Sequence, residues 1–283
     1  MDKPLLRRSL DPDPDAVVQR DQRSIPKGAW TSALGYLVPA VVALVLLAAA
    51  WEVWVRVFDT KVYILPGPWV VLERLFGDIG YFADHGWTTL WEAMAGFGLG
   101  CAVALTGATI MAHSKMLERS LFPLAVLVKV IPIVAVAPLF VIWFGFGSFP
   151  KVLIAAEITF FPVLVNGLTG LRSVDPGALD FFTSLNASSR EIFIKLRVPS
   201  SLPYLFAAFR ISIPLAVIGA VVGEFFTGDR GLGAVIIVAH NNLDMPTLFS
   251  AVFTLAFMGI TLTMLTSYAE KKALFWHDSE ITA

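Results

Sequence analysis

The sequence predicts an all-α membrane protein with six transmembrane helices. Of its 283 residues, 57% are hydrophobic and 15% are charged, whereas a soluble domain carries about a quarter charged residues. Six apolar stretches are each long enough to cross the hydrocarbon core, which takes about 20 helical residues. We expect helices because lipid offers no partner to an unpaired backbone N–H or C=O group.

The chain divides into a polar tail and a membrane domain. Residues 1–30 are rich in proline and carry charges of both signs, and they lack the apolar core and cleavage site of a signal peptide. We therefore expect a disordered cytoplasmic tail over residues 1–30 and a six-helix transmembrane domain over residues 31–283. The predicted spans are 35–58, about 88–112, 121–144, 151–171, 203–226 and 247–268.

Basic residues indicate the orientation, because they favour the cytoplasmic side. Two of the 21 Lys and Arg residues, Lys129 and Arg210, lie within spans, and five lie in the predicted outer segments. With both termini inside, the other 14 fall in the cytoplasmic segments 1–34, 113–120, 172–202 and 269–283.

Two predicted outer segments are too short to span but apolar enough to be helical. In 64–76, Gly67-Pro68 marks a helix start, since the missing proline N–H would be unpaired there anyway. We expect this helix at the membrane surface. The apolar centre of 227–246 predicts a second interfacial or re-entrant helix.

Small residues and prolines within the spans predict how the helices pack and bend. Gly96 and Gly100 form a small-xxx-small pattern that lets two helix backbones approach closely. Each proline of the third span removes a helical hydrogen bond and should bend that helix. These prolines are Pro123, Pro132 and Pro138.

Ionisable residues inside spans are expensive to bury in lipid, so they indicate either a functional site or an ion pair between helices. Lys129 lies in the third span and Glu157 in the fourth, while Glu224 lies near the outer end of the fifth. We take Lys129 and Glu157 as candidates for contact with a transported solute. The alternatives are a satisfied interhelical pair, or an exposed position near the outer leaflet for Glu157.

The sequence carries no recognisable enzymatic motif. It has no G-x-x-x-x-G-K-[ST] phosphate loop, no H-E-x-x-H and no G-x-S-x-G. The single cysteine, Cys101, lies in an apolar run, and the four histidines are far apart along the chain. We expect no catalytic residue, metal or cofactor, and the net charge of −1 predicts no nucleic-acid partner. A transporter, a channel or a scaffold remains.

The loop between the fourth and fifth spans predicts a helical hairpin. Asp175 is a good N-cap and Pro176 a good first residue for a helix over 177–185. Asn186 tolerates the left-handed conformation that ends such a helix. A second helix is predicted over 188–196, ended by Val198-Pro199 because the residue before proline avoids the helical region. The hairpin would present a ridge to a soluble partner, or its basic residues would rest on anionic lipid.

This hairpin resembles the signature of ABC-importer permeases, E-A-A-x-x-x-G-x9-I-x-L-P. Two phenylalanines replace the alanines and Asn186 replaces the glycine, while the spacing and the last proline are kept. The matching positions are Asp180, Phe181, Phe182, Asn186, Leu196, Val198 and Pro199. Four further stretches resemble the same family, namely ILPGPWVV (64–71), VIPIVAVAPLFVIWFGFG (130–147), FFPVLVNGLTGLRSVDP (160–176) and GEFFTGDRGLG (223–233).

The resemblance implies the type I ABC importer permease (MetI-like) fold in a bacterial inner membrane. In this family two permease chains, usually identical, enclose a path, two ATPase subunits hydrolyse ATP at the inner loops, and a solute-binding protein delivers the solute. The chain itself would then not be an enzyme, and 177–185, within the coupling loop 172–202, would be the coupling helix. The implied ATPase contacts are Asp180, Phe181, Phe182, Asn186, Ala187, Ser188, Arg190 and Pro199.

The solute is less clearly indicated. The stretch 216–233 is more similar to permeases for thiamin pyrimidine precursors and riboflavin than to those for sulfonates. Glu157 disfavours an anion, whereas Lys129 argues for one. Permeation of sulfonate, taurine, nitrate or another small organic anion therefore stays an alternative, and a stand-alone channel or carrier is the alternative class.

Overall fold

The computed structural model describes residues 29–275, with side chains from residue 38 onward, and every element in this part of the chain is helical. The predicted tail lies outside the described residues except for its last two, which begin the first helix. The elements are α2 (Ala29–Val57), α3 (Pro68–Gly77), α4 (Ile79–His113), α5 (Lys115–Val130), α6 (Ile133–Phe144), α7 (Ser148–Arg172), α8 (Pro176–Ser184), α9 (Ser189–Ile192), the π-helix η1 (Phe193–Arg197), α10 (Val198–Thr227), α11 (Leu232–Asn241) and α12 (Met245–Ala273).

The helices confirm the predicted membrane architecture. Within residues 29–275, five helical stretches are long and apolar enough to cross a membrane, and the bent pair of α5 and α6 makes a sixth. Among the described residues, 29–53, which make up most of α2, belong to one compact unit, and residues 54–275 belong to another. The arrangement described below is that of the second unit.

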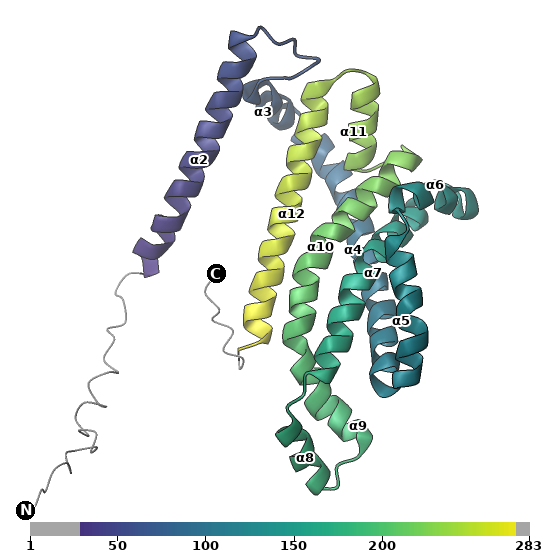
Figure 1. Cartoon of the computed structure of the whole chain (residues 1–283). Coiled ribbons are helices and arrows are strands. Elements are labelled where there is room, and N and C mark those ends of the chain that lie inside the picture. The colour runs from purple at the N-terminus through teal and green to yellow at the C-terminus, as the bar shows by residue number, and fades with distance from the viewer. Residues whose placement is uncertain (1–28, 276–283) are drawn as a thin grey trace, which may run out of the picture. The chain divides into compact units, whose positions relative to one another are not determined.

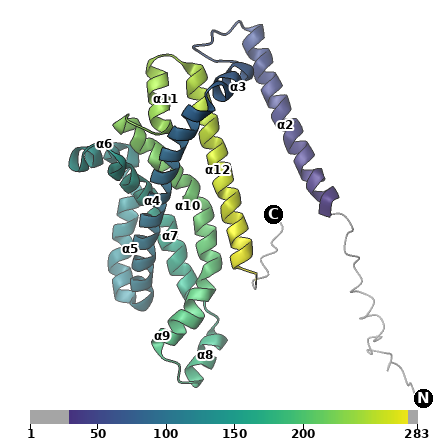
Figure 2. The ribbon, with the colours of Figure 1, turned by 180° about the vertical axis from the view of Figure 1, so that it is seen from behind.

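Three long helices, α4, α7 and α10, lie side by side at the centre of this unit (Figures 1 and 2). Glycines set their spacing: a Cβ on Gly100 would lie 2.7 Å from the Ala156 carbonyl oxygen, and one on Gly219 would lie 2.7 Å from the Ala155 Cα. A Cβ on Gly96 would be equally crowded by α7. The close approach predicted from Gly96 and Gly100 is therefore confirmed, with α7 as the neighbouring helix.

The predicted third span is not one helix. It consists of α5 and α6, which are bent by 95° relative to each other. Pro132 lies at the break, and Ile131 before it has an extended conformation with ψ of 124°, because the residue before proline avoids the helical region. Pro123 and Pro138 lie inside α5 and α6, so only one of the three prolines ends a helix.

The two predicted short helices are both present at one end of the unit. The first, α3, begins at Pro68 as expected and packs on α12, where Arg74 Nε donates to Thr247 Oγ1 at 2.9 Å. The second, α11, buries Leu232 and Val235 against Phe82 of α4. At the same end, α4 begins at Ile79 rather than near residue 88, so this end of the unit is helical almost throughout.

Candidate functional site

Helices α8 and α9 form a hairpin at the end of the second unit opposite α11 (Figure 1). Asp175 caps α8, since its Oδ2 accepts from the Ala178 N–H at 2.8 Å. The helix begins at Pro176, one residue before the predicted start. Asn186 has a φ of 54°, in the left-handed region that the sequence predicts. The cap, the nine-residue length and the stop of this helix are thus confirmed, with both ends one residue earlier than predicted.

The second arm of the hairpin is closed by reciprocal capping. The Glu191 N–H donates to Ser188 Oγ at 3.3 Å, and the Ser188 N–H donates to Glu191 Oε2 at 3.0 Å. Lys195 pairs with Glu191 at 3.2 Å. Such a capping box satisfies donors that a helix start leaves unpaired, so the turn between the two helices has a defined shape.

The predicted end of this arm at Val198-Pro199 is wrong. The chain instead passes through η1 into α10 as one continuous helical stretch from Ser189 to Thr227. The Val198 N–H donates to the Phe193 carbonyl, five residues earlier, which is a π-type hydrogen bond. The wider turn accommodates the ring of Pro199, which has no N–H to donate. The second arm of the hairpin and the α10 span therefore form one continuous helical stretch.

The tip of the hairpin is exposed and apolar. Phe181, Leu185 and Ile194 are 61%, 64% and 52% exposed. Arg190 is also exposed, whereas Pro199 lies half-buried at the start of α10, away from the tip. Exposed apolar groups rimmed by polar residues are typical of protein–protein contacts. The remaining sequence candidates lie on or beside the tip and are exposed or half-buried, namely Asp180, Phe182, Asn186, Ala187 and Ser188.

The two predicted path residues, Lys129 and Glu157, line one cavity of about 300 Å³ at the break between α5 and α6. The Lys129 Nζ lies 4.5 Å from the ring centroid of Phe161, within the range of a cation–π contact. Glu157 Oε2 is buried and has no hydrogen-bond partner among the residues that the structure describes. Within the same residues neither charge belongs to an ion pair, so the interhelical pair is not formed there.

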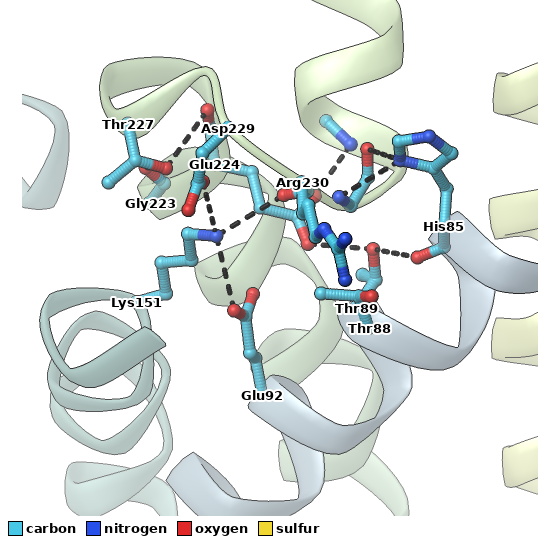
Figure 3. Close-up of polar contacts among 12 residues, drawn as sticks. His85, Thr88, Thr89, Glu92, Lys151, Gly223, Glu224, Thr227, Asp229 and Arg230 are labelled. Atoms are coloured by element: carbon cyan, nitrogen blue, oxygen red, sulfur yellow. Dashed lines mark hydrogen bonds and ion pairs between the residues drawn. The ribbon is translucent and has the colours of Figure 1, made fainter. Parts of the chain in front are cut away.

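A second group of charges lies where α4, α7 and α10 meet the turn before α11 (Figure 3). Lys151, in the first turn of α7, is 1% exposed. Its Nζ lies 3.1 Å from Glu92 Oε1 and 2.8 Å from Asp229 Oδ1, and it donates to the Arg230 carbonyl at 3.2 Å. One buried lysine thus ties three segments together.

Glu224 extends this network from the end of α10 (Figure 3). It is fully buried, and its carboxylate accepts from Thr89 Oγ1 at 2.7 Å and from the Gly233 N–H at 2.6 Å. Thr89 Oγ1 in turn accepts from the Leu232 N–H at 2.8 Å. Gly231 has a φ of 105°, and a Cβ there would overlap the Glu224 carboxyl group. The acidic side chain therefore fixes the backbone of the turn.

We name Glu92, Lys151, Glu224 and Asp229 the turn network. Buried charges are stable when they are paired and hydrogen-bonded. Lys151 meets that condition through Glu92, Asp229 and the Arg230 carbonyl, while Glu224 accepts two hydrogen bonds but belongs to no ion pair among the described residues. Partial burial works against ionisation of Asp229, but hydrogen bonds from Lys151 and the Arg230 N–H outweigh it and lower the pKa of Asp229 below its usual range. The network holds the α10–α11 turn without needing a ligand.

The sequence reasoning did not find this network. Of its members, only Glu224 was noted as a charge at depth. Lys151 was counted on the outer side, and Glu92 was not singled out, although that acidic residue lies inside the second predicted span. Its charge within an apolar stretch was the available signal. Arg210, the other cation within a span, pairs with Glu270 of α12.

Comparison with known proteins places these features in a family. Residues 96–271 match the family described as "Binding-protein-dependent transport system inner membrane component". The riboflavin transport system permease protein RibX of Chloroflexus aurantiacus is 37% identical over 91% of this chain and 95% of that protein. The formylaminopyrimidine transport permease protein ThiX of Halalkalibacterium halodurans is 34% identical over 76% and 86%.

The fold also has a solved counterpart. A chain from an inward-facing structure of the MetNI methionine ABC transporter superposes with a TM-score of 0.60 at 15% sequence identity, covering 69% of this chain and 97% of that chain. The region matched by the family runs from within α4 to the last turn of α12. It therefore contains the hairpin, the cavity and three members of the turn network, while the fourth, Glu92, lies just before it.

Proposed function

The chain belongs to the family of binding-protein-dependent transport system inner membrane components, and from this premise we propose how its parts work. It is the multi-pass permease subunit of an ABC importer. In the proposed assembly two copies of the chain enclose the path, two separate ATPase subunits bind the α8–α9 hairpins, and a solute-binding protein docks at the end that carries α3 and α11.

The observation that carries the proposed coupling is the rigid, exposed hairpin joined without a break to α10. Phe181 and Leu185 supply an apolar contact to an ATPase surface, and Arg190 beside them is placed to pair with a carboxylate. Because η1 and α10 continue the same helical stretch, movement of a bound ATPase would reach the membrane span directly. The ATPase also supplies the phosphate-binding loop that this sequence lacks.

The proposed orientation puts the hairpin and both chain ends in the cytoplasm. The asymmetry of basic residues supports it, and so does the need of ATPase subunits for cytoplasmic ATP. Localisation in a bacterial inner membrane follows from the family.

For the solute we propose a pyrimidine precursor of thiamin or a riboflavin-like compound. The support is the likeness to RibX and ThiX, whose names state riboflavin and formylaminopyrimidine transport. Lys129 and Glu157 would meet the solute in the cavity at the α5–α6 break. A sulfonate, taurine, nitrate or another small organic anion is the alternative.

Reversal of the hairpin charge tests this function. In a complex of the full chain with its ATPase subunits, Arg190→Glu should reduce solute-stimulated ATP hydrolysis and uptake by about tenfold or more, as expected for loss of a charge-assisted contact. The variant should still insert in the membrane. Lys115→Glu is the matched control, because Lys115 is exposed and lies outside the hairpin, and it should transport normally.

Two results would count against the proposal. Normal coupling in Arg190→Glu would remove this residue from the ATPase contact. If no ATPase subunit co-purifies with the wild-type chain, the permease assembly itself is wrong, and a stand-alone channel or carrier takes its place.

A further inference from the structure

The cavity at the α5–α6 break contains two opposite charges that do not neutralise each other. Lys129 comes from the last turn of α5 and Glu157 from α7. In a medium of low dielectric, opposite charges attract strongly when nothing holds them apart. Here the Phe161 ring holds the Lys129 ammonium group through a contact of 4.5 Å.

The spacing along α7 explains why the two charges stay separate. Glu157 and Phe161 are four residues apart, so they lie one above the other on the same face of the helix. Lys129 occupies the Phe161 level, about one helical turn or 5–6 Å from the Glu157 level. A solute of modest length can therefore touch both charges at once, with one end at each.

The turn network provides a comparison for the lack of pairing between Lys129 and Glu157. There the same chain pairs a buried lysine with Glu92 at 3.1 Å and with Asp229 at 2.8 Å. Glu157 is half-buried, and its one buried oxygen has no partner among the described residues, which costs free energy in the absence of a ligand, while Lys129 is exposed and can be reached by one. Charges retained at membrane depth without mutual pairing are therefore better explained by a partner that comes and goes.

The backbone at the break adds neutral polar groups to the same cavity. Ile131 and Pro132 are not helical and line it. The last carbonyls of α5 and the first N–H groups of α6 have no partner within their own helices. Irregular backbone at membrane depth is tolerated where it is buried in protein or lines a water-filled cavity, so the break indicates a hydrated cavity.

We propose that this cavity selects an amphoteric solute, one that presents a hydrogen-bond acceptor or anionic group to Lys129 and a donor group to Glu157. This inference rests on the proposed function and defines its solute class. A simple anion would be repelled by Glu157, and a simple cation by Lys129. Lys129 alone favours an anionic solute, and Glu157 alone disfavours one. Together the two residues require different groups at the two ends of one molecule. A volume of about 300 Å³ is at the lower end of small-molecule sites and fits a single-ring or similarly short solute.

The test compares matched probes that differ by one donor group. Full-length permease in complex with its ATPase subunits is placed in lipid nanodiscs, and equilibrium binding is measured for taurine against ethanesulfonate and for 4-aminopyrimidine against pyrimidine. The member with the donor should bind about tenfold more tightly, since one hydrogen bond to a charged group has about that effect. Equal affinity within both pairs would overturn the proposal.

Variants assign the discrimination to the two residues. Glu157→Gln should strengthen ethanesulfonate binding, because the repulsion of the sulfonate is removed. The affinity for taurine should then exceed that for ethanesulfonate by about threefold or less. Lys129→Gln should weaken both sulfonates. The double variant K129E/E157K exchanges the two charges. It should still bind the probe with the donor group more tightly, with the two ends of the solute in exchanged positions.

The controls are Lys115→Gln and Glu73→Gln, which change exposed residues outside the cavity and should bind all four probes as the wild type does. If every cavity variant discriminates as the wild type does, the solute contacts lie elsewhere and the proposal fails. The proposed function then still stands, provided that ATPase subunits co-purify and uptake remains ATP-dependent. Loss of those two properties in the wild type would instead contradict the proposed function itself.

Discussion

The turn network and the α5–α6 cavity hold charges at membrane depth in opposite ways. In the turn network Lys151 and Glu224 have several polar partners each, and both are buried. In the cavity Glu157 has a buried oxygen without a partner, and Lys129 contacts an aromatic ring. The buried Lys151 is thus paired with carboxylates, whereas the exposed Lys129 and the half-buried Glu157 are left open to a further partner.

The backbone also differs between the turn network and the cavity. Near the turn network the helices are continuous and in close contact, and a Cβ on Gly223 would lie 2.8 Å from the Lys151 Cα. Around the cavity the helix is interrupted at Pro132 and space remains. In the proposed function the first region stays fixed and the second admits the solute. Substitutions in the two regions should therefore separate stability from transport.

The largest loss of stability is expected from Lys151→Met. The variant leaves Glu92 buried without its cation, and removal of one partner of a buried pair costs about 3–5 kcal/mol. Thermal unfolding of the detergent-solubilised chain measures the effect, together with the yield of folded protein. Lys195→Met is the control, because its pair with Glu191 is exposed and is worth at most about 1 kcal/mol. Equal losses in the two variants would contradict the structural role of the network.

Two glycines of the α10–α11 turn provide a closer comparison. Gly228 has φ of 65° and ψ of 10°, in the left-handed region where alanine is strained by about 1–2 kcal/mol. Gly231 has φ of 105° and ψ of 167°, a region essentially restricted to glycine, where the strain is about 1–3 kcal/mol. Only at Gly231 does the new Cβ also overlap the Glu224 carboxyl group, whereas at Gly228 it meets open space. Displacement of Glu224 from its donors should add about 1–3 kcal/mol.

Chemical denaturation of the two alanine variants measures that difference. The prediction requires Gly231→Ala to be clearly the less stable variant. Similar stabilities would mean that the turn relaxes and that Glu224 does not fix it.

The same substitution in the two regions should separate stability from transport. Glu92→Gln removes the charge that faces Lys151 and should cost about 1–3 kcal/mol. Glu157→Gln removes a charge whose buried oxygen has no partner among the described residues, so stability should stay within about 0.5 kcal/mol of the wild type while uptake changes.

Thermal unfolding and ATP-driven uptake of both variants test this contrast. Unchanged uptake in Glu157→Gln would return that residue to a structural role. A loss of stability equal to that of Glu92→Gln would show that Glu157 has a partner after all.

Much of the fold follows from local sequence signals, since span length, apolarity and helix capping are properties of short stretches. Asp175 and Asn186 therefore identify both ends of α8. Prolines are harder to interpret because their effect depends on the surroundings. Pro132 breaks a helix, Pro138 lies within one, and Pro199 is absorbed by a π-turn. No local pattern distinguishes these three outcomes.

Local sequence patterns indicate even less about the candidate sites than about the fold. The charge of Lys129 and Glu157 within apolar spans is enough to identify them, but their place on one cavity results from the bend between α5 and α6. Lys151 lies at the edge of a span, where an exposed lysine is the usual case. Its partner Glu92 is 59 residues away in the sequence, so only packing of α4 against α7 brings the pair together.

The smallest effect is expected at the exposed member of the turn network. Asp229 is 44% exposed, so solvent screens its pair with Lys151, and Asp229→Asn should cost at most about 1 kcal/mol. The pH dependence has a defined sign. Because the folded state lowers the pKa of Asp229, its contribution to stability is complete above about pH 4, the ordinary value for an aspartate, and disappears only as the pH falls through the lower folded pKa.

Thermal unfolding of wild type and Asp229→Asn between pH 8 and pH 3 measures this contribution. The difference between the two proteins should be small and constant down to about pH 4–5 and should shrink below that. A difference as large as that of Lys151→Met would mean that Asp229 is as essential as the buried members. A difference that disappears near pH 6 would mean that the folded pKa of Asp229 is raised, and the ion pair with Lys151 would then be incorrect.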